Sequence, residues 1–365
     1  MQTGQQTNSL RSLDDIQSFL ARVRAAFAAE PFRPHTAFRT GHSQTLVAYA
    51  WPRSYRFNPS PKDEERMFEV EPHMKVLAQC RWQEERQKHA TVVIWHGMEG
   101  STSSSYMIAT ADKAFRAGFN VVRVNFRNCG GTEHLTPTLY HGGLSDDLRV
   151  VVNQLIESDG LKRFFLLGFS LGGNMVLKLA GEYGEDLPSE VVAVCAVSPS
   201  VDLHASSVQI LRKRNWIYHQ GFFNSLKKRI QLKKKLYPDL YDLSRLPHIR
   251  TIREFDEEFV SRACGFADAD DYYHRASSIR VVAGIRVTTL IIHAQDDPFI
   301  PFDPLREAVF SENPYILLIG PTHGGHVAFL SSKRAGEDRF WAENRAVEFF
   351  LMANEAGSAT THGTS

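Results

Sequence analysis

The chain has 365 residues, and 42 Lys and Arg against 41 Asp and Glu leave a formal net charge of +1. Hydrophobic residues make up 43% and charged residues 23%, close to the globular average, which excludes collagen-like and wholly disordered chains. The balanced charge gives no electrostatic reason to expect a nucleic-acid partner, and we expect none.

The sequence also bears on the cellular compartment. Its apolar runs are all far shorter than the roughly 18 residues that a membrane-spanning helix needs. Residues 1–20 lack the continuous apolar core of a secretory signal. Four scattered cysteines, Cys80, Cys129, Cys195 and Cys264, are too few for a disulfide framework. We therefore expect a cytoplasmic protein with reduced thiols, of unknown oligomeric state.

Six short runs rich in Val, Ile, Leu and Phe predict strands. They are continuously apolar instead of alternating, which is typical of parallel strands covered on both faces. Residues 144–158, with Asp146 and Asp147 near their start and apolar residues at helical spacing, predict a helix between two of them. The alternation predicts βαβ units and an α/β fold. The six runs are residues 91–95, 121–126, 164–169, 191–197, 287–292 and 315–319.

This alternation stops between residues 199 and 286, where no convincing strand appears. The segment is too long for a loop in a compact domain, and its stretch 211–235 is strongly basic. We expect a helical cap on the main domain. The predicted division is an N-terminal extension (1–34), the core (35–198 and 282–352), the cap insertion (199–281) and a flexible tail (353–365).

The strongest local motif is Gly-x-Ser-x-Gly at residues 168–172, directly after an apolar run and before a helical one. A nucleophile elbow requires this order, because the serine sits in a strained turn and the glycines leave room for close backbone approach. The motif makes Ser170 the candidate nucleophile. The alternative is a serine that only caps a helix behind a glycine-rich turn.

A serine nucleophile needs a base that is oriented by a carboxylate. In α/β-hydrolases the order along the chain is serine, acid, histidine. Asp297 follows the predicted strand 287–292, and His326 follows the strand 315–319, so both lie past the carboxyl ends of strands, where open α/β sheets place their sites.

Each of these two positions has a neighbour of the same type. We prefer Asp297 to Asp296 because of its place in Ala-Gln-Asp-Asp, four residues before a proline, and expect Asp296 to cap the turn. We prefer His326 to His323 because two glycines precede it and can shape a loop that presents it. A metal site made of His293, Asp297, His323 and His326 ranks low, because neither H-E-x-x-H nor paired C-x-x-C spacing occurs.

Acyl transfer also requires donors for the oxyanion. The backbone N–H of Leu171, next after the candidate nucleophile, is one. The loop 95–101, Trp-His-Gly-Met-Glu-Gly-Ser, offers the N–H of Met98 as the second, unless this loop is an ordinary glycine-rich strand exit. No metal or organic cofactor is required.

Several motifs together resemble the YheT-like branch of the α/β-hydrolase superfamily, a group of esterases related to animal lipases and to fungal medium-chain ester synthases/esterases. The resemblance implies an α/β-hydrolase fold with a mostly parallel, doubly wound sheet and the cap between the sixth and seventh core strands. It also implies a charge relay of Ser170, Asp297 and His326 and carboxylic-ester hydrolysis. Many members have Arg-Gly-Cys where this chain has Arg-Asn-Cys at 127–129. The matching pieces are residues 41–46 (GHSQTL), 96–101 (HGMEGS), 127–131 (RNCGG), 140–148 (YHGGLSDDL), the elbow, 296–299 (DDPF) and 323–329 (HGGHVAF).

Two weaker patterns have simpler explanations. His141 and Asp146 fit an H-x4-D pattern linked with acyltransferases, but a loop histidine before a helix start explains them better. Cys129 has no feature nearby that marks an activated thiol.

The predicted function is therefore cleavage of short- to medium-chain or lipid-like esters, with a small-molecule ester as the partner. The alternatives are acyl transfer to an alcohol by the same three residues and an inactive binding module. The cap aromatics Trp216, Tyr218, Phe222 and Phe223 line an acyl pocket or pack the cap on the core. The basic run 227–235 makes weak peripheral contact with an anionic membrane or is simply a solvated face.

Overall fold

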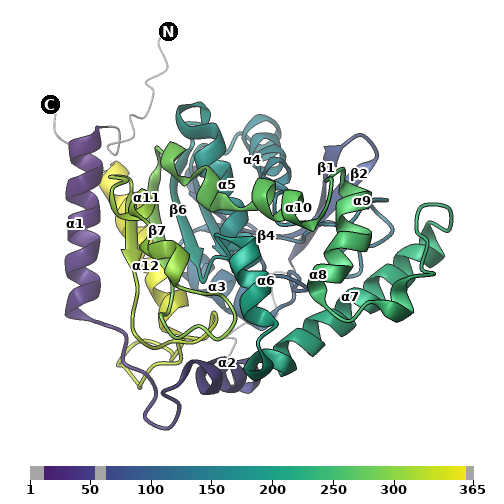
Figure 1. Cartoon of the computed structure of the whole chain (residues 1–365). Helices are drawn as coiled ribbons and strands as arrows, with labels where there is room; N and C mark the ends of the chain where they lie inside the picture. Colours follow the sequence, from purple (N-terminus) through teal and green to yellow (C-terminus); the bar gives the residue numbers. More distant parts are fainter. Residues whose placement is uncertain (1–11, 54–62, 359–365) are drawn as a thin grey trace, which may run out of the picture.

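The computed structural model describes residues 12–53 and 63–358 of the chain. Its centre is one eight-stranded sheet in the order β1-β2-β4-β3-β5-β6-β7-β8 (Figure 1). The strands β3 to β8 pair in parallel, whereas β2 pairs antiparallel with β1 and β4. The bounds are β1 Glu64–Glu71, β2 Met74–Arg81, β3 Thr91–Trp95, β4 Asn120–Val124, β5 Phe164–Phe169, β6 Val191–Val197, β7 Thr288–Ile292 and β8 Ile316–Ile319.

Helices cover both faces of this sheet. On β3, Val92 and Ile94 belong to the apolar cluster shared with α1, α3 and α12, whereas Val93 and Trp95 belong to the cluster shared with α4 and α5. Every residue of the central strands is buried, because both faces have a helical layer. The fold is therefore the expected doubly wound α/β-hydrolase arrangement. The covering helices are α1 Leu13–Ala29, α3 Ser105–Arg116, α4 Ser145–Asp159, α5 Leu171–Tyr183 and α12 Trp341–Ser358.

The helical cap expected between two core strands is present between β6 and β7. In Figure 1 its longest helix, α7, projects from the side of the molecule that is remote from α1. Among the residues that the structure describes, this interval contains no strand. Its main elements are α6 Leu203–Ile210, α7 Trp216–Leu236, α8 Ile252–Phe255, a π-helical turn Asp256–Val260, α9 Ser261–Cys264 and α10 Ala269–Ala276.

The sequence analysis missed one element and is wrong about another. The hairpin β1–β2 was not among the predicted strands. The flexible tail expected from residue 353 is wrong for residues 353–358, because α12 continues to Ser358. Ala353 is completely buried in the cluster that joins α12 to the sheet. The remainder of that tail, 359–365, and the start of the N-terminal extension lie outside the described residues.

Within the two described ranges, no helix is both long and apolar enough to cross a lipid bilayer.

Candidate active site

Ser170 lies in a sharp turn between β5 and α5. Its backbone has φ 54° and ψ −116°, a conformation that is costly for any residue with a side chain and that is found mainly at functional sites. A Cβ at Gly168 would collide with the backbone of Gly172. A Cβ at Gly172 would lie 2.6 Å from the carbonyl oxygen of Trp95. The glycines of the motif are thus required by the packing of β3 and α5 against the turn.

Two hydrogen bonds join the three side chains that the sequence singled out. His326 Nε2 lies 3.0 Å from Ser170 Oγ, and His326 Nδ1 lies 2.7 Å from Asp297 Oδ2. The other oxygen of Asp297 accepts the backbone N–H groups of Phe299 and Ile300, at 3.1 and 2.9 Å. The carboxylate is therefore fixed from both sides, and the imidazole stands between it and the serine hydroxyl.

The electrostatic surroundings keep Asp297 ionised although it is buried. Burial raises the pKa of this carboxyl, but His326, His293 and the N–H of Ile300 outweigh that effect and hold the pKa below its ordinary value. A carboxylate in this place can stabilise a positive charge that develops on His326.

Asp296, the alternative acid, belongs to a separate pair. Its Oδ2 lies 3.1 Å from His323 Nδ1, and its Oδ1 accepts the N–H of Gly325 at 3.0 Å. Both neighbours that the sequence left open, Asp296 and His323, therefore contact each other beside the His326 loop and do not contact Ser170.

The loop that follows β3 is fixed by hydrogen bonds from its backbone to two tyrosine hydroxyls. The N–H of Gly97 donates to Tyr106 Oη at 2.9 Å, and the N–H of Glu99 donates to Tyr140 Oη at 3.2 Å. Met98, between these two residues, lines the same pocket as Ser170 and Leu171. Leu171 is the first residue of α5, so its N–H has no carbonyl partner within the helix.

His96 holds the start of this loop as a neutral imidazole. Its Nε2 accepts the N–H of Phe126 at 2.9 Å, which leaves the proton on Nδ1 to donate to the Gly97 carbonyl at 2.7 Å. Burial lowers the pKa of His96 to about 4. The loop is thus anchored by a side chain that stays uncharged at neutral pH.

The motif at residues 41–46 supports the histidine loop, a role that the sequence did not reveal. It forms the first part of α2, Gly41–Ala50. Thr45 Oγ1 accepts the N–H of His326 at 2.9 Å and donates to the Gly41 carbonyl at 2.7 Å. Gln44 bonds both backbone groups of Leu330, at 2.7 and 3.0 Å. No spacing rule connects these positions, because about 280 residues separate α2 from the loop it holds.

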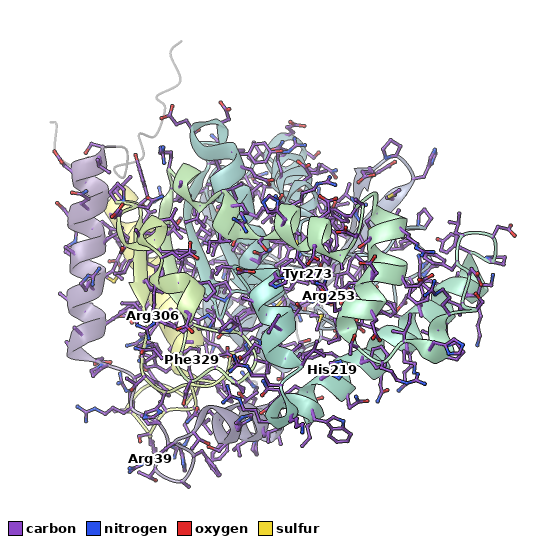
Figure 2. The ribbon with its side chains drawn as sticks, in the orientation of Figure 1. Arg39, His219, Arg253, Tyr273, Arg306 and Phe329 are labelled. Atoms are coloured by element: carbon purple, nitrogen blue, oxygen red, sulfur yellow. The ribbon has the colours of Figure 1, made fainter. Side chains whose placement is uncertain are left out.

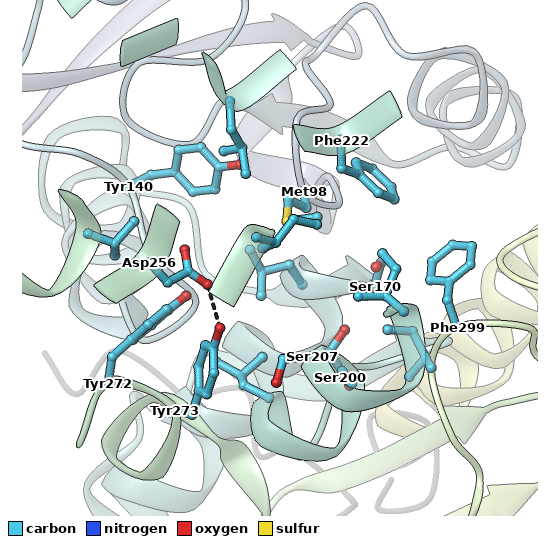
Figure 3. Close-up of a pocket in the computed structure, with 18 residues that line it drawn as sticks. Met98, Tyr140, Ser170, Ser200, Ser207, Phe222, Asp256, Tyr272, Tyr273 and Phe299 are labelled. Atoms are coloured by element: carbon cyan, nitrogen blue, oxygen red, sulfur yellow. Dashed lines mark hydrogen bonds between the residues drawn. The ribbon is translucent and has the colours of Figure 1, made fainter. Parts of the chain in front are cut away.

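Ser170 opens onto a pocket between the core and the cap, with an empty volume of about 760 Å³ including its opening to solvent. Figure 3 shows Ser170 and Phe299 at one end of this pocket and Asp256, Tyr272 and Tyr273 at the other. Most of the wall between them is apolar. Its members include Leu203, Ile210, Phe222, Leu226, Ile252 and Val260.

Three of the four cap aromatics take one of the two expected roles. Phe222 lines the pocket, and Tyr218 stacks on His42 of α2, with ring centroids 5.7 Å apart. Phe223 is buried in the core cluster, where it packs the cap on the main domain. Trp216 does neither, because 64% of it is exposed.

The weaker motifs do not join the site. His141 Nδ1 accepts the N–H of Gly143, whereas Asp146 accepts the Tyr183 hydroxyl, so the two members of the H-x4-D pattern have different partners. Burial raises the pKa of the Cys129 thiol to about 12, which leaves it protonated and a poor nucleophile.

The chain matches a family model described as the alpha/beta hydrolase fold over residues 90–332. It is 31% identical over 331 residues to the Escherichia coli (strain K12) protein named "Putative esterase YheT", covering 90% of this chain and 95% of that protein. It is also 31% identical over 260 residues to a monoacylglycerol lipase of Saccharomyces cerevisiae, covering 69% of this chain but only 57% of the lipase.

Among solved structures, the esterase Pf2001 of Pyrococcus furiosus is similar in fold. The TM-score is 0.53 at 17% identity, over 82% of this chain and 93% of that one. The match to the family model and the identity to YheT over nearly the full length of both proteins lead to one conclusion: the chain belongs to the α/β-hydrolase fold family, in the branch of carboxylic ester hydrolases that includes YheT.

Proposed function

We propose that the protein is a serine hydrolase that cleaves carboxylic esters by way of a covalent acyl-enzyme. The observation that carries the proposal is the unbroken pair of hydrogen bonds from Asp297 through His326 to Ser170, which itself lines a largely apolar pocket. The strained backbone of Ser170 supports the same role, because such strain persists mainly where function requires it.

In the proposed mechanism, Ser170 Oγ attacks the ester carbonyl carbon while its proton passes to His326 Nε2. Asp297 accepts the Nδ1–H of the imidazole and so keeps the other nitrogen free to act as a base. The N–H groups of Met98 and Leu171 donate to the oxyanion of the tetrahedral intermediate. The alcohol leaves with the proton from His326. A water molecule, deprotonated by His326, then attacks the acyl-enzyme and releases the acid.

The decisive experiment replaces the nucleophile. Ser170→Ala is expected to lower kcat for p-nitrophenyl butyrate by about four orders of magnitude or more and to abolish labelling by a fluorophosphonate probe. Ser200→Ala is the matched control, because Ser200 lines the same pocket and should leave the probe reaction intact. Near wild-type ester hydrolysis by Ser170→Ala would refute the proposal.

The preferred acyl group is proposed from the shape and polarity of the pocket. Its apolar wall suits short- to medium-chain or lipid-like acyl groups, because burial of apolar chain is favourable by about 0.8 kcal/mol per methylene group. A series of p-nitrophenyl esters of increasing chain length should show kcat/KM rising and then falling where the chain exceeds the pocket.

Transfer of the acyl group to an alcohol is the second candidate reaction. It uses the same acyl-enzyme and differs only in which hydroxyl compound attacks it. A Saccharomyces cerevisiae relative, 26% identical over 84% of this chain and 75% of its own length, is named a medium-chain fatty acid ethyl ester synthase/esterase. Product analysis in water containing ethanol distinguishes the two reactions by the ratio of ethyl ester to free acid.

Peripheral membrane contact through α7 and a cytoplasmic location stay predictions. The contact gains support from Trp216 and Ile217, of which 64% and 62% are exposed at the start of the helix, and from exposed Lys228 and Lys235 further along it. Co-sedimentation with anionic liposomes should therefore weaken on Trp216→Ala and on Lys228→Gln. Binding that is insensitive to both changes would exclude this surface.

A further inference from the structure

The end of the pocket remote from Ser170 is polar, and the proposed mechanism uses none of its groups. Asp256, Tyr272 and Tyr273 meet there, all of them at least nine-tenths buried (Figure 3). Asp256 is the first residue of the π-helical turn in the cap. Such turns are rare and often occur at functional sites, because they reposition a side chain inside a helix.

Only part of the hydrogen-bonding capacity of this group is used within the protein. Tyr273 Oη donates to Asp256 Oδ2 at 2.7 Å. Among the residues that the structure describes, none donates a hydrogen bond to the other oxygen, Oδ1. The Tyr272 hydroxyl accepts the N–H of Gly142 at 3.0 Å, and its own hydrogen has no acceptor within the described chain. One acceptor and one donor are therefore left over at the same end of the pocket.

The charges around Asp256 argue against a cationic ligand. Burial raises the pKa of this carboxyl to about 7, more than Tyr273 and Arg253 lower it, so the group is partly protonated at neutral pH. Arg253 lies beside Tyr273 (Figure 2), with its guanidinium carbon 5.8 Å from the centre of that ring, and its charge is paired with Asp270 through two hydrogen bonds of 2.8 Å. An ammonium group would lose its hydration in a largely apolar pocket and would find a carboxyl that is only partly ionised.

A hydroxyl group is a small, uncharged functional group that can both donate and accept a hydrogen bond. It can donate to Asp256 Oδ1 and accept from Tyr272 Oη. An ionised carboxylate or a phosphate would have to lose its hydration in a largely apolar pocket, beside the ionised fraction of Asp256.

We propose that Asp256 and Tyr272 form a second binding site, which takes a hydroxyl group carried by the ester substrate at the end remote from the scissile carbonyl. The inference rests on the proposed function, since the same molecule must place its carbonyl at Ser170. It assigns to the protein a preference for hydroxylated esters over plain alkyl esters of equal length.

The first test needs only the unaltered protein. Two series of esters of increasing length are compared, one with the terminal hydroxyl on the acyl chain and one with it on the alcohol. Each hydroxylated ester is paired with its plain and terminally aminated analogues. At the length that reaches Asp256, the hydroxylated ester should have a kcat/KM about tenfold or more above the plain one in one of the two series. Equal rates at every length in both series, or a preference for the amine, would overturn the proposal.

Variants then assign the preference to the two residues. Asp256→Leu and Tyr272→Phe should each bring the ratio of hydroxylated to plain ester close to one, whereas Asp256→Asn, which keeps an accepting oxygen, should keep most of it. Ser207→Ala is the control, because Ser207 lines the pocket but its hydroxyl bonds the His204 carbonyl of its own helix at 2.8 Å. An unchanged ratio in both Asp256→Leu and Tyr272→Phe would contradict the assignment.

The two proposals fail in distinguishable ways. If Ser170→Ala hydrolyses both kinds of ester at the wild-type rate, the proposed function is wrong. If hydrolysis requires Ser170 but the hydroxyl gives no preference, only the second binding site is wrong. Should a cap variant not fold, the comparison of esters with the unaltered protein still decides the question.

Discussion

Two adjacent carboxylates, Asp296 and Asp297, lie beside the candidate histidine, and the structure gives them different partners. Asp297 accepts the Nδ1–H of His326, so it determines which ring nitrogen carries the proton. We predict that Asp297→Asn lowers kcat by three to four orders of magnitude, about as much as the wrong histidine tautomer costs in serine proteases. Steady-state hydrolysis of p-nitrophenyl butyrate measures the loss.

The neighbouring carboxylate provides the matched control. Asp296→Asn removes a charge one residue away and disturbs His323, but it leaves the bond from His326 to Asp297 intact. Its effect on kcat should be far smaller than that of Asp297→Asn. Equal losses in the two variants would mean that the carboxylates act through loop structure and that Asp297 has no specific role.

Thr45 is predicted to be a positioning residue, because it holds the backbone of His326 from α2. Thr45→Val removes the accepting oxygen at nearly constant volume. It should lower kcat by about ten- to a hundredfold through misplacement of the imidazole, with KM much less affected. Thr45→Ser, which restores the oxygen, should recover most of the activity. If Thr45 served only folding, Thr45→Val would lower the melting temperature, and kcat of the folded protein would not fall more than KM changes.

At the residue scale, the sequence alone allowed the selection of candidate residues that follow strands. Ser170, Asp297 and His326 could be selected because each comes just after an apolar run, and parallel strands bring their carboxyl ends to one edge of the sheet. Thr45 and Asp256 could not be found in this way. Their contacts join segments far apart in the sequence, and a single polar residue in a helix carries no local sign of its partner.

At the scale of elements, the basic helix α7 has two faces of different function. Lys228 and Lys235 are exposed, whereas Arg229 and Lys233, four residues apart, point toward the core. Arg229 pairs with Glu99 of the loop after β3, at 2.9 and 3.1 Å. A run of like charges in a sequence does not distinguish these faces, which is why 227–235 could be interpreted only as a solvated or membrane-facing stretch.

We predict that Arg229→Leu strongly destabilises the protein. It would leave the Glu99 carboxylate, whose side chain is 4% exposed, buried without its ionic partner. Breaking such a pair typically costs about 3–5 kcal/mol. Urea denaturation should register this loss, and the double variant Arg229→Leu/Glu99→Leu should regain part of it. Lys228→Gln on the exposed face should change the free energy of unfolding by about 0.5 kcal/mol or less.

The strands also differ in how clearly the local sequence predicts them. The six parallel strands β3 to β8 were predictable to within two residues, because most of their residues are buried and apolar. The hairpin β1–β2 at the sheet edge buries only alternate residues, among them Phe68, Val76 and Ala78, within otherwise polar sequence. Its period of two was present but weak, and the turn Pro72-His73 contains no glycine, although His73 has a φ of 64°.

For the molecule as a whole, the buried titratable groups set the response to acid. Burial lowers the pKa of His96 to about 4 and that of His141 to about 3, against roughly 6.5 in an unfolded chain. As the pH falls below 6.5, the unfolded chain binds protons that the folded protein does not, so the free energy of unfolding decreases. Each histidine contributes a slope of up to about 1.4 kcal/mol per pH unit. Asp256 has the opposite effect. Its pKa is raised to about 7, so its protonation as the pH falls favours the folded state and offsets the contribution of about one histidine.

Together, His96, His141 and Asp256 make the protein lose stability between about pH 6.5 and pH 4, by the equivalent of roughly one proton. Urea denaturation at about pH 7.5 and about pH 5 measures this change, and His141→Gln should make the difference between the two values smaller. His134→Gln is the control, because His134 is exposed. Asp256→Asn should make the loss steeper, since it removes the one group among these three that binds its proton more tightly when folded. A stability that is constant over this interval in the wild-type protein would contradict the assignment of neutral buried histidines to the folded state.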